Sequence, residues 1–331
     1  MRIIVTGATG YVGRALVPHL SRLGYTGVAV GRKTAFALPQ GWSYAERDQI
    51  LTRGEAGDWL VHLEVKQHVL APTEKDLREF EEVNVLGTIQ WLEWCSRFDV
   101  RKFLYFSSIK AVNPEFETAP ADESATGPGD TPYGKSKWAA EEAVRKWAGR
   151  DSKQRGVIVR PAVIYGPRNK ANVSAMVKAI DKQRFFLPDG GKNIKSLVSI
   201  GNVVAAVAHF LGKSSEACET YNLVDSRSYT VREFSSLIAG ALGKNYTPAS
   251  IPAALLVLPA FFGDIAARIG LGFPLTSSRL KALTEQTWFT GAKLERSGFH
   301  PPESTELAVS MLIEWYRSSS QNPGNKPPEA T

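Results

Sequence analysis

Cysteine and histidine are scarce in this sequence, and their scarcity excludes several classes of protein. The 331 residues include 2 cysteines and 5 histidines. Cys95 and Cys218 lie far apart and without a CxxC pattern, so neither a disulfide framework nor a zinc site is expected. The histidines lack metal-ligand spacing, and we expect no metal. This usage fits a reducing compartment such as the cytoplasm, with Cys95 as a buried helix residue.

Long apolar runs and clusters of cations are also rare. The most apolar segment, residues 251–263, is too short and too interrupted by proline to span a bilayer. We expect it to form a helix in the core or at an interface, with contact to a membrane surface as the alternative and no stable membrane insertion. A strand pattern begins within three residues of the start, so no leader segment is expected. The net charge of +7 is spread along the chain, which argues against binding to nucleic acid.

A regular alternation of strand and helix patterns fills the first half of the chain. Amphipathic segments at 12–24 and 76–98 separate short β-branched runs at 2–7, 26–31, 59–64, 101–108 and 156–166. Such alternation predicts an α/β fold with a doubly wound parallel sheet. Beyond residue 167 the pattern loosens, with helices expected at 201–212, 230–242 and 304–317. We therefore expect a dinucleotide-binding and catalytic domain at 1–166, a smaller mixed α/β domain, mostly for substrate, at 167–317, and a disordered tail at 318–331.

A glycine-rich turn follows the first predicted strand and opens the first predicted helix. In TGATGYVG, residues 6–13, Gly7 permits a tight turn, Gly10 lets the backbone approach a pyrophosphate, and Gly13 allows the helix to pack closely on the strand. The helix N-terminus then offers free N–H groups and a positive dipole to the phosphates. The motif predicts a Rossmann-type dinucleotide site at the start of the chain.

A second motif, PYGKSK at 132–137, places Tyr133 and Lys137 on one face of a predicted helix. This spacing alone is weak evidence, but Ser107 and Ser108 end a predicted strand at the edge where a parallel sheet presents its catalytic groups. A serine hydroxyl, a tyrosine phenol and a lysine ammonium together can catalyse proton transfer coupled to hydride transfer. An ammonium lowers the pKa of a phenol and orients a nicotinamide ribose, a hydroxyl holds the substrate oxygen, and the phenol moves the proton as a hydride is transferred.

Together with FSSIK, NVLGT (84–88) and RPAVIYGP (160–167), these motifs resemble those of the extended short-chain dehydrogenase/reductase family. They occur in the same order along the chain as in that family, and they cover nearly the whole chain. PYGKSKWAAEE and YGPRNKAN are similar to bacterial nucleotide-sugar 4-epimerases and 4-keto reductases. The resemblance implies that Ser108, Tyr133 and Lys137 are catalytic. It also implies a larger cofactor-binding set, namely Gly7, Thr9, Gly10, Tyr11, Val12, Asp48, Gln49, Leu63, Tyr133, Lys137 and Arg160. The substrate candidates are Ser108, Lys110, Asn172, Lys195 and Arg279.

The sequence departs from the family pattern at two places, and the first of these departures excludes one reaction. Family dehydratases carry Asp-Glu after the catalytic Ser/Thr, and this chain has Ile109 and Lys110 there, so 4,6-dehydration is not expected. After the third predicted strand, relatives carry small residues where this chain has Glu64 in HLEV. Either this carboxylate reshapes the edge of the cofactor site, or the alignment is displaced by one residue.

The second predicted strand ends in Gly31-Arg32-Lys33 instead of the acid that NAD-selective folds use for the ribose hydroxyls. Arg32 and Lys33 suit a 2′-phosphate, although two solvated cations at a strand end are the plain alternative. We predict NADP(H), with NAD(H) possible. A reductase must take fresh NADPH at each turnover, whereas a 4-epimerase retains NAD⁺.

The cofactor preference leads us to expect an enzyme that reduces the C4 keto group of a UDP-linked 2-acetamido-2,6-dideoxy-4-keto-hexose, a surface polysaccharide precursor. The first alternative is a UDP-hexose 4-epimerase with retained NAD. A second, from another class, is a non-catalytic dinucleotide sensor or scaffold. Relatives dimerise through the helices that correspond to residues 76–98 and 133–150, so a homodimer is expected, although the tryptophans of these segments would equally suit packing against the sheet.

Overall fold

The chain divides into two compact units. The computed structural model describes residues 1–31, 36–69, 72–116, 118–169, 171–213, 218–268 and 275–321. The first unit comprises Met1–Ile164, Ile200–Val224 and Phe289–Pro302, and the second comprises Tyr165–Ser199, Asp225–Trp288 and Glu303–Thr331. The chain first leaves the first unit close to the boundary expected at residue 166. It then returns twice, so neither unit is one continuous stretch.

A parallel sheet forms the centre of the first unit. Within the described residues it has seven strands in the order β11–β6–β5–β4–β1–β2–β3, and every neighbouring pair is parallel. The strands are β1 (Arg2–Thr6), β2 (Thr26–Val30), β3 (Trp42–Ala45), β4 (Trp59–His62), β5 (Lys102–Phe106), β6 (Arg155–Pro161) and β11 (Cys218–Leu223). The strand order reverses between β1 and β4, and such a reversal is where doubly wound sheets bind ligands. The predicted fold class is confirmed.

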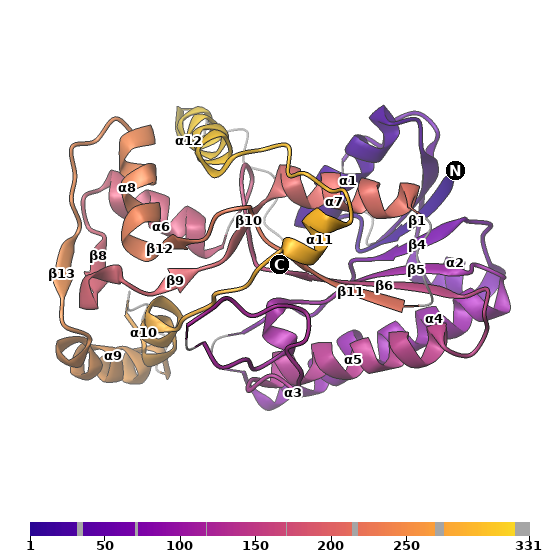
Figure 1. The fold of residues 1–331 in the computed structure, drawn as a ribbon, viewed down its shortest axis with the longest axis horizontal. Helices are drawn as coiled ribbons and strands as arrows, with labels where there is room; N and C mark the ends of the chain where they lie inside the picture. Colours follow the sequence, from indigo (N-terminus) through magenta and orange to yellow (C-terminus); the bar gives the residue numbers. More distant parts are fainter. Residues whose placement is uncertain are drawn as a thin grey trace. The chain divides into compact units, whose positions relative to one another are not determined.

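Helices cover both faces of this sheet. Figure 1 shows α1 (Tyr11–Arg22) and α7 (Ile200–Gly212) on one face, and α4 (Gly87–Arg97) and α5 (Pro132–Ala148) on the other. Shorter helices of this unit are α2 (Arg47–Arg53), α3 (Glu74–Glu79), the 3₁₀ turn η2 (Ile109–Ala111) and α11 (Ala292–Arg296). The segment predicted as one helix at 76–98 is divided, because a π-helical stretch, η1 (Phe80–Leu86), joins α3 to α4.

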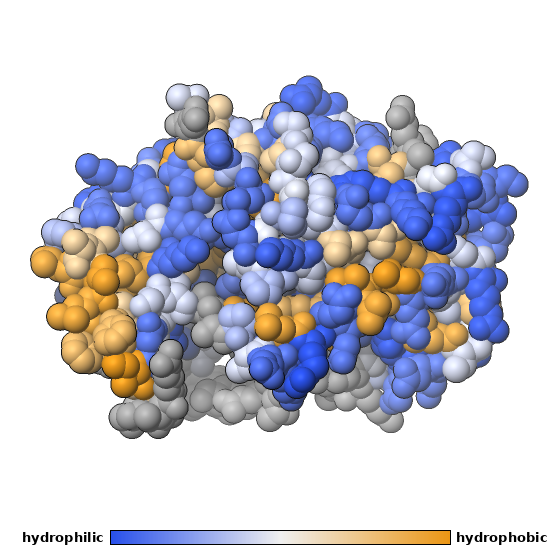
Figure 2. Space-filling model, turned by 90° about the horizontal axis from the view of Figure 1, so that it is seen from below, coloured by the Kyte–Doolittle hydropathy of each residue, from blue (hydrophilic) through white to orange (hydrophobic). Residues whose placement is uncertain are grey.

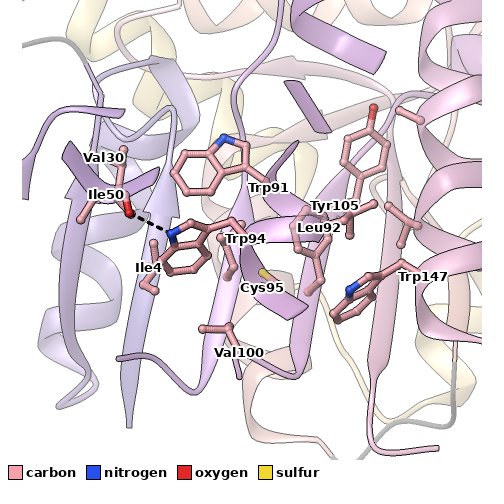
Figure 3. Packing of buried hydrophobic residues seen from close by; sticks show 14 of the residues in the cluster. Ile4, Val30, Ile50, Trp91, Leu92, Trp94, Cys95, Val100, Tyr105 and Trp147 are labelled. Atoms are coloured by element: carbon pink, nitrogen blue, oxygen red, sulfur yellow. Dashed lines mark hydrogen bonds between the residues drawn. The ribbon is translucent and has the colours of Figure 1, made fainter. Parts of the chain in front are cut away.

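Tryptophans of α4 and α5 pack into the core between these helices and the sheet. Trp91, Trp94 and Trp147 are buried in one cluster with Cys95 and with residues of β1, β2, β5 and β6 (Figure 3). The indole Nε1 of Trp94 donates a hydrogen bond to the Ile50 carbonyl at 2.8 Å. These three tryptophans therefore stabilise the unit internally, and Cys95 is a buried helix residue as expected.

The second unit is a mixture of short strands and helices. Its helices are α6 (Asn172–Asp181), the 3₁₀ turn η3 (Asp189–Gly191), α8 (Val231–Ala241), α9 (Ala253–Arg268), α10 (Ser277–Thr284) and α12 (Thr305–Gln321). Its strands are β8 (Phe186–Pro188), β9 (Ile194–Lys195), β10 (Leu197–Ser199), β12 (Tyr229–Thr230) and β13 (Ala249–Ile251), and β7 (Val163–Tyr165) links the units along the chain. Apolar residues of α6, α8 and α12 share one core. Helix α12 extends to Gln321, so the first four residues of the predicted tail are helical, and the remainder lies outside the described residues.

Helix α9 differs from its expected packing. The segment is helical, as the sequence predicted, but only a narrow stripe containing Leu256 and Ala260 is buried. Large side chains such as Leu258 and Phe262 are exposed, so the preference for core packing is wrong for most of this helix. Among the residues that the structure describes, no helix is both long enough and apolar enough to cross a membrane.

Candidate active site

The glycine-rich turn between β1 and α1 is built as the motif requires. Gly7 has a φ of 65°, and its carbonyl accepts a hydrogen bond from the N–H of Gly10 at 2.9 Å. A Cβ on Gly7 would lie 2.8 Å from the backbone N of Glu64, and one on Gly13 would lie 2.5 Å from the backbone of Ala8. Neither position can accept a side chain, because each lies against the backbone of a neighbouring segment.

This turn leaves the start of α1 open to an anion. Gly10 is the N-cap of α1 and has no side chain with which to cap the first-turn N–H groups, which belong to Tyr11, Val12 and Gly13. These donors, together with the positive end of the helix dipole, suit a pyrophosphate. The residues present therefore fit a dinucleotide at this end of the sheet.

The end of β2 lies beside the same turn. The N–H of Ala8 donates to the Val30 carbonyl at 3.1 Å, and a Cβ on Gly31 would lie 3.0 Å from the Thr9 hydroxyl. Gly31, which follows β2, thus lies next to the glycine turn. Arg32 and Lys33, the predicted 2′-phosphate contacts, lie outside the described residues, and their role stays a prediction.

Other predicted cofactor contacts lie at the carboxyl ends of neighbouring strands. Asp48 and Gln49 begin α2 directly after β3, and both are exposed. The Gln49 side chain takes part in the capping box of this helix by accepting from the Glu46 N–H. Leu63 follows β4, and its N–H donates to the Thr6 carbonyl at 3.2 Å. Leu63 therefore lies at the strand-order reversal, whereas Asp48 and Gln49 follow the edge strand β3, and Gln49 already serves as a helix cap.

Glu64 occupies the edge of this region, and the structure shows where its carboxylate goes. Its Oε2 accepts a hydrogen bond from the indole Nε1 of Trp91 at 3.0 Å and lies 3.3 Å from Nε of Arg47. The backbone of Glu64 contacts Gly7, while the charge is paired with Arg47. The carboxylate is therefore paired with the Arg47 guanidinium and hydrogen-bonded to the Trp91 indole, and both contacts compensate its charge.

Ser108 and Tyr133 are hydrogen-bonded to each other, and Lys137 contacts the end of the strand that precedes Ser108. Ser108 follows β5, caps the 3₁₀ turn η2 by accepting from the Lys110 N–H, and hydrogen-bonds with the Tyr133 side chain. Helix α5 begins with Pro132 because Thr131 caps it, accepting from the Gly134 N–H at 3.0 Å. Lys137 lies one helical turn after Tyr133 on α5, and its Nζ donates a hydrogen bond to the Phe106 carbonyl at 2.5 Å.

The electrostatics of this group follow from burial. Burial raises the pKa of Tyr133 to about 12, and the hydrogen bond from Ser108 opposes that rise. Burial lowers the pKa of Lys137 to about 7, against the opposing influence of the Glu141 carboxylate. Tyr133 therefore holds its proton at neutral pH, and Lys137 is only partly protonated there, because burial disfavours its charged form. Perturbed groups of this kind are typical of active sites.

The buried ammonium predicts a pH-dependent stability difference for Lys137→Met. The pKa of Lys137 is about 7 in the folded protein and has an ordinary value of 10.5, so between these values the unfolded chain binds more protons than the folded one. Wild-type stability should therefore rise relative to the variant from pH 7 to pH 10, by on the order of 3 kcal/mol. Urea unfolding of both proteins at the two pH values measures this difference. The exposed Lys146→Met on the same helix is the control, and an identical shift there would contradict the prediction.

Gly134, inside the PYGKSK motif, is required by close packing that the sequence did not reveal. A Cβ on Gly134 would lie 2.2 Å from the Lys110 carbonyl oxygen. The glycine therefore lets the start of α5 lie directly against the turn that follows Ser108. This contact sets the separation of the Ser108 and Tyr133 side chains.

We expect Gly134→Ala to lower kcat/KM by about 100-fold, because a displacement near 1 Å between catalytic groups has an effect of that size. Steady-state kinetics measures the loss, and circular dichroism checks that the variant is folded. Gly240→Ala on α8 is the matched control, since a Cβ there meets nothing within 4 Å. Equal kinetics for the two variants would show that the contact with Lys110 does not position Tyr133.

A buried carboxylate under the site was missed by sequence reasoning. Glu141 on α5 accepts hydrogen bonds from Ser107 Oγ at 2.5 Å, Arg160 Nε at 2.9 Å, Arg160 Nη2 at 2.7 Å and Arg145 Nη2 at 2.6 Å. Arg160 also donates to the Ala125 carbonyl. Its guanidinium is therefore used within the protein, and this geometry does not favour the predicted cofactor contact. The Glu141 network joins α5, which carries Tyr133 and Lys137, to the ends of β5 and β6.

Asn84 is a second residue that was overlooked, although its motif was noted. It is buried in the π-helical stretch η1, where it donates to Ser136 Oγ at 2.9 Å and accepts from the Lys66 N–H at 2.8 Å. It thereby connects α5 to the segment after β4. π-helical turns are frequent at functional sites, and the aromatic rings of His68 and Phe80 contact Tyr133 in the same region.

The predicted substrate contacts divide between the units. Lys110 belongs to the first unit, in the turn after Ser108, while Asn172, Lys195 and Arg279 belong to the second. Asn172 is the exposed first residue of α6, and Arg279 is exposed on α10. Lys195 Nζ donates to the carbonyls of Ala282 and Glu285 and so caps the C-terminal end of α10. Lys195 thus has a structural role, and its predicted substrate contact remains untested.

Comparisons with a protein-family model and with curated proteins both point to sugar epimerases. The model of the "NAD dependent epimerase/dehydratase family" matches residues 3–223. The N-acetyl-α-D-glucosaminyl-diphospho-ditrans,octacis-undecaprenol 4-epimerase of Escherichia coli O157:H7 is 28% identical, over 95% of this chain and 94% of the relative. The UDP-glucose 4-epimerase of Vibrio cholerae is 31% identical, over 73% of this chain and 76% of the relative.

A solved structure supports the fold independently. The UDP-glucose 4-epimerase of Thermotoga maritima superposes with a TM-score of 0.76 at 20% identity, over 97% of this chain and 100% of that chain. The family match covers more than half of the chain, including the glycine turn and the Ser108, Tyr133 and Lys137 group. The chain belongs to the NAD-dependent epimerase/dehydratase family and is an NAD(P)-dependent nucleotide-sugar epimerase or reductase.

Proposed function

We propose that this enzyme inverts the configuration at C4 of a hexose or N-acetylhexosamine attached to a diphosphate. The observation that carries the proposal is the near full-length similarity to a diphospho-sugar 4-epimerase from Escherichia coli. A second relative is a UDP-glucose 4-epimerase. The 4-keto reduction favoured on sequence grounds depends mainly on Arg32 and Lys33, which lie outside the described residues, so epimerisation now has the broader support.

The chain supplies the groups that such a reaction needs. A bound nicotinamide dinucleotide supplies a site that accepts a hydride from C4 and returns it. Because burial raises the pKa of the Tyr133 phenol to about 12, the base must be the phenolate that positive charge beside it stabilises. That phenolate takes the proton of the C4 hydroxyl and gives it back to the same oxygen, while Ser108 holds that oxygen by a hydrogen bond. The buried ammonium of Lys137 orients the ribose and favours the ionised phenol. The proton and the hydride both return to the sugar, so no net oxidation occurs.

The reductase remains the second candidate, because the sequence after β2 carries cations where an NAD-selective enzyme carries an acid. In that case NADPH would be consumed with a UDP-linked 4-keto sugar. The intact catalytic group argues against the non-catalytic alternative. We also retain as proposals a homodimer through α4 and α5 and a UDP-sugar substrate, with the polyprenyl-diphosphate sugar of the Escherichia coli relative as the other carrier.

The test compares substrates and cofactors directly. The purified protein is incubated with UDP-N-acetylglucosamine, UDP-glucose or polyprenyl-diphosphate-linked N-acetylglucosamine, and the sugars are released by mild acid and separated. Inversion at C4 without added cofactor, together with NAD⁺ released on heat denaturation, supports the proposal. Absence of inversion with all three substrates, combined with NADPH consumption by a UDP-linked 4-keto sugar, would establish the reductase. Arg32→Asp then tests whether the basic strand end selects NADPH.

A further inference from the structure

Helix α9 presents an apolar face to solvent. Its buried residues, Leu256, Ala260 and Gly263, lie on one narrow stripe. The opposite side carries what we call the α9 face, whose six residues are each more than 40% exposed: Leu255, Val257, Leu258, Phe261, Phe262 and Ile265. Leu255, Leu258, Phe262 and Ile265 follow the i, i+3, i+7, i+10 spacing of a single helical surface. A helix that is apolar around most of its circumference but buried on only one stripe normally packs its exposed apolar side against another protein or a membrane.

The exposed apolar residues are contiguous instead of scattered. Figure 2 shows them gathered at the left end of the molecule, over the helix that Figure 1 labels α9. The rings of Phe261 and Phe262 lie next to each other, with their centroids 6.0 Å apart. Single exposed apolar side chains are ordinary in soluble proteins, whereas contiguous patches mark contacts with proteins or membranes.

Cations lie beside this face. Helix α10 packs on α9 through Leu280, which shares a core with Leu256 and Ala260. Its exposed residues include Arg279 and Lys281. Lys281 and Val257 line the same open hollow of about 450 Å³ between the two helices. An ammonium therefore borders the apolar side chains directly.

The acids near α9 are engaged with backbone groups. Asp189 Oδ1 accepts from the Ala253 N–H at 2.8 Å, at the start of the helix. Asp264 Oδ1 accepts from the Ser277 N–H at 3.1 Å. Both carboxylates keep their charge, and Asp189 lines the same hollow as Lys281, so the leucines and phenylalanines of this surface are bordered by charges of both signs.

We propose that the α9 face docks on the surface of an anionic lipid bilayer. The apolar side chains would enter the boundary between headgroups and acyl chains, while Lys281 and Arg279 face anionic headgroups. The net charge of +7 favours the same surface. Helix α9 has 16 residues and cannot cross a bilayer, so it lies in the plane of the interface. Two copies packed on this face would instead bring the cations of both chains to one interface, which disfavours a symmetric dimer there.

This inference goes beyond the proposed function, because it assigns a place of action and does not depend on the reaction catalysed. An epimerase held at a bilayer would meet diphosphate sugars carried on membrane lipids. The binding test requires no turnover, so failure of the docking proposal and failure of the proposed reaction are separate results.

The test is vesicle flotation at low and high salt, with vesicles that contain phosphatidylglycerol and with vesicles of phosphatidylcholine alone. We expect the full chain to float with the anionic vesicles. The triple variant Leu255→Asn, Leu258→Asn, Phe262→Asn should bind at least about tenfold more weakly, because binding scales with the buried apolar area. Leu307→Asn is the matched control, since Leu307 is also an exposed leucine on a helix of this unit. Lys281→Glu should weaken binding to anionic vesicles only.

Circular dichroism and thermal unfolding check that the variants are folded, which the exposure of these positions favours. The proposal is overturned if the wild type stays in solution at low salt, or if the triple variant floats as the wild type does. It is also overturned if sedimentation shows a wild-type dimer that the triple variant loses, because the α9 face would then be an interface between copies.

Discussion

Replacing Tyr133 with phenylalanine is expected to lower kcat by a factor of about 10²–10⁴ while leaving the fold intact. The hydroxyl is the group that exchanges a proton with the substrate oxygen, and phenylalanine lacks only that group. The remaining ring keeps its contacts with His68 and Phe80. KM should change little, because the lost interaction strengthens mainly in the transition state. Steady-state kinetics, with whichever of the three candidate substrates the incubation test selects, measures both parameters.

Tyr246→Phe is the matched control for this variant. The Tyr246 hydroxyl donates to the Phe185 carbonyl in the second unit, so its removal should lower stability by about 1 kcal/mol without altering kcat. Ser108→Ala should lie between the two, because it removes one hydrogen bond to the substrate oxygen but leaves the acid in place. Loss of the acid–base group should lower kcat by at least about 100-fold. If Tyr133→Phe lowered kcat by less than about tenfold, another group would have to carry the proton.

The central sheet was predictable because its strands are buried on both faces and therefore appear as continuous β-branched runs. Strands β3 and β11 were missed for the opposite reason. β3 has four residues, and β11, CETYNL, is an edge strand with partly exposed polar positions. The exposure of α9 could not be predicted either. Its sequence is apolar on every side, and only tertiary partners decide which stripe is buried.

The placement of Ser108, Tyr133 and Lys137 could be predicted because it depends on local spacing and on strand direction. Tyr133 and Lys137 are one helical turn apart, and Ser108 ends a strand whose direction the parallel sheet dictates. Contacts between segments distant in sequence were not accessible in this way. The Lys110 carbonyl against Gly134 and the pairing of Glu141 with Arg160 depend on how α5 packs on the sheet. The same limit explains why the hydrogen bonds of Lys195 to the end of α10 could not be predicted.

Glu141→Gln is expected to destabilise the protein by about 3–5 kcal/mol, which is the usual effect of removing one partner from a buried ion pair. The carboxylate is 0% exposed, and the Arg160 side chain opposite it is 2% exposed. A glutamine amide would direct donor N–H groups toward guanidinium donors and leave the Arg160 charge uncompensated. Chemical denaturation measures the loss, and activity should fall with it because the network fixes α5 to β5 and β6.

The neighbouring residue provides the control for this prediction. Glu142, on the same helix, pairs with Arg145 at 2.5 Å but is 55% exposed. Glu142→Gln should cost less than about 1 kcal/mol, because exposed ion pairs contribute little. The double variant Glu141→Leu, Arg160→Leu should recover stability relative to Glu141→Gln, since removing both charges leaves none buried and unpaired. Equal losses for Glu141→Gln and Glu142→Gln would contradict this, and would mean that the buried pair of Glu141 and Arg160 does not hold α5 against the sheet.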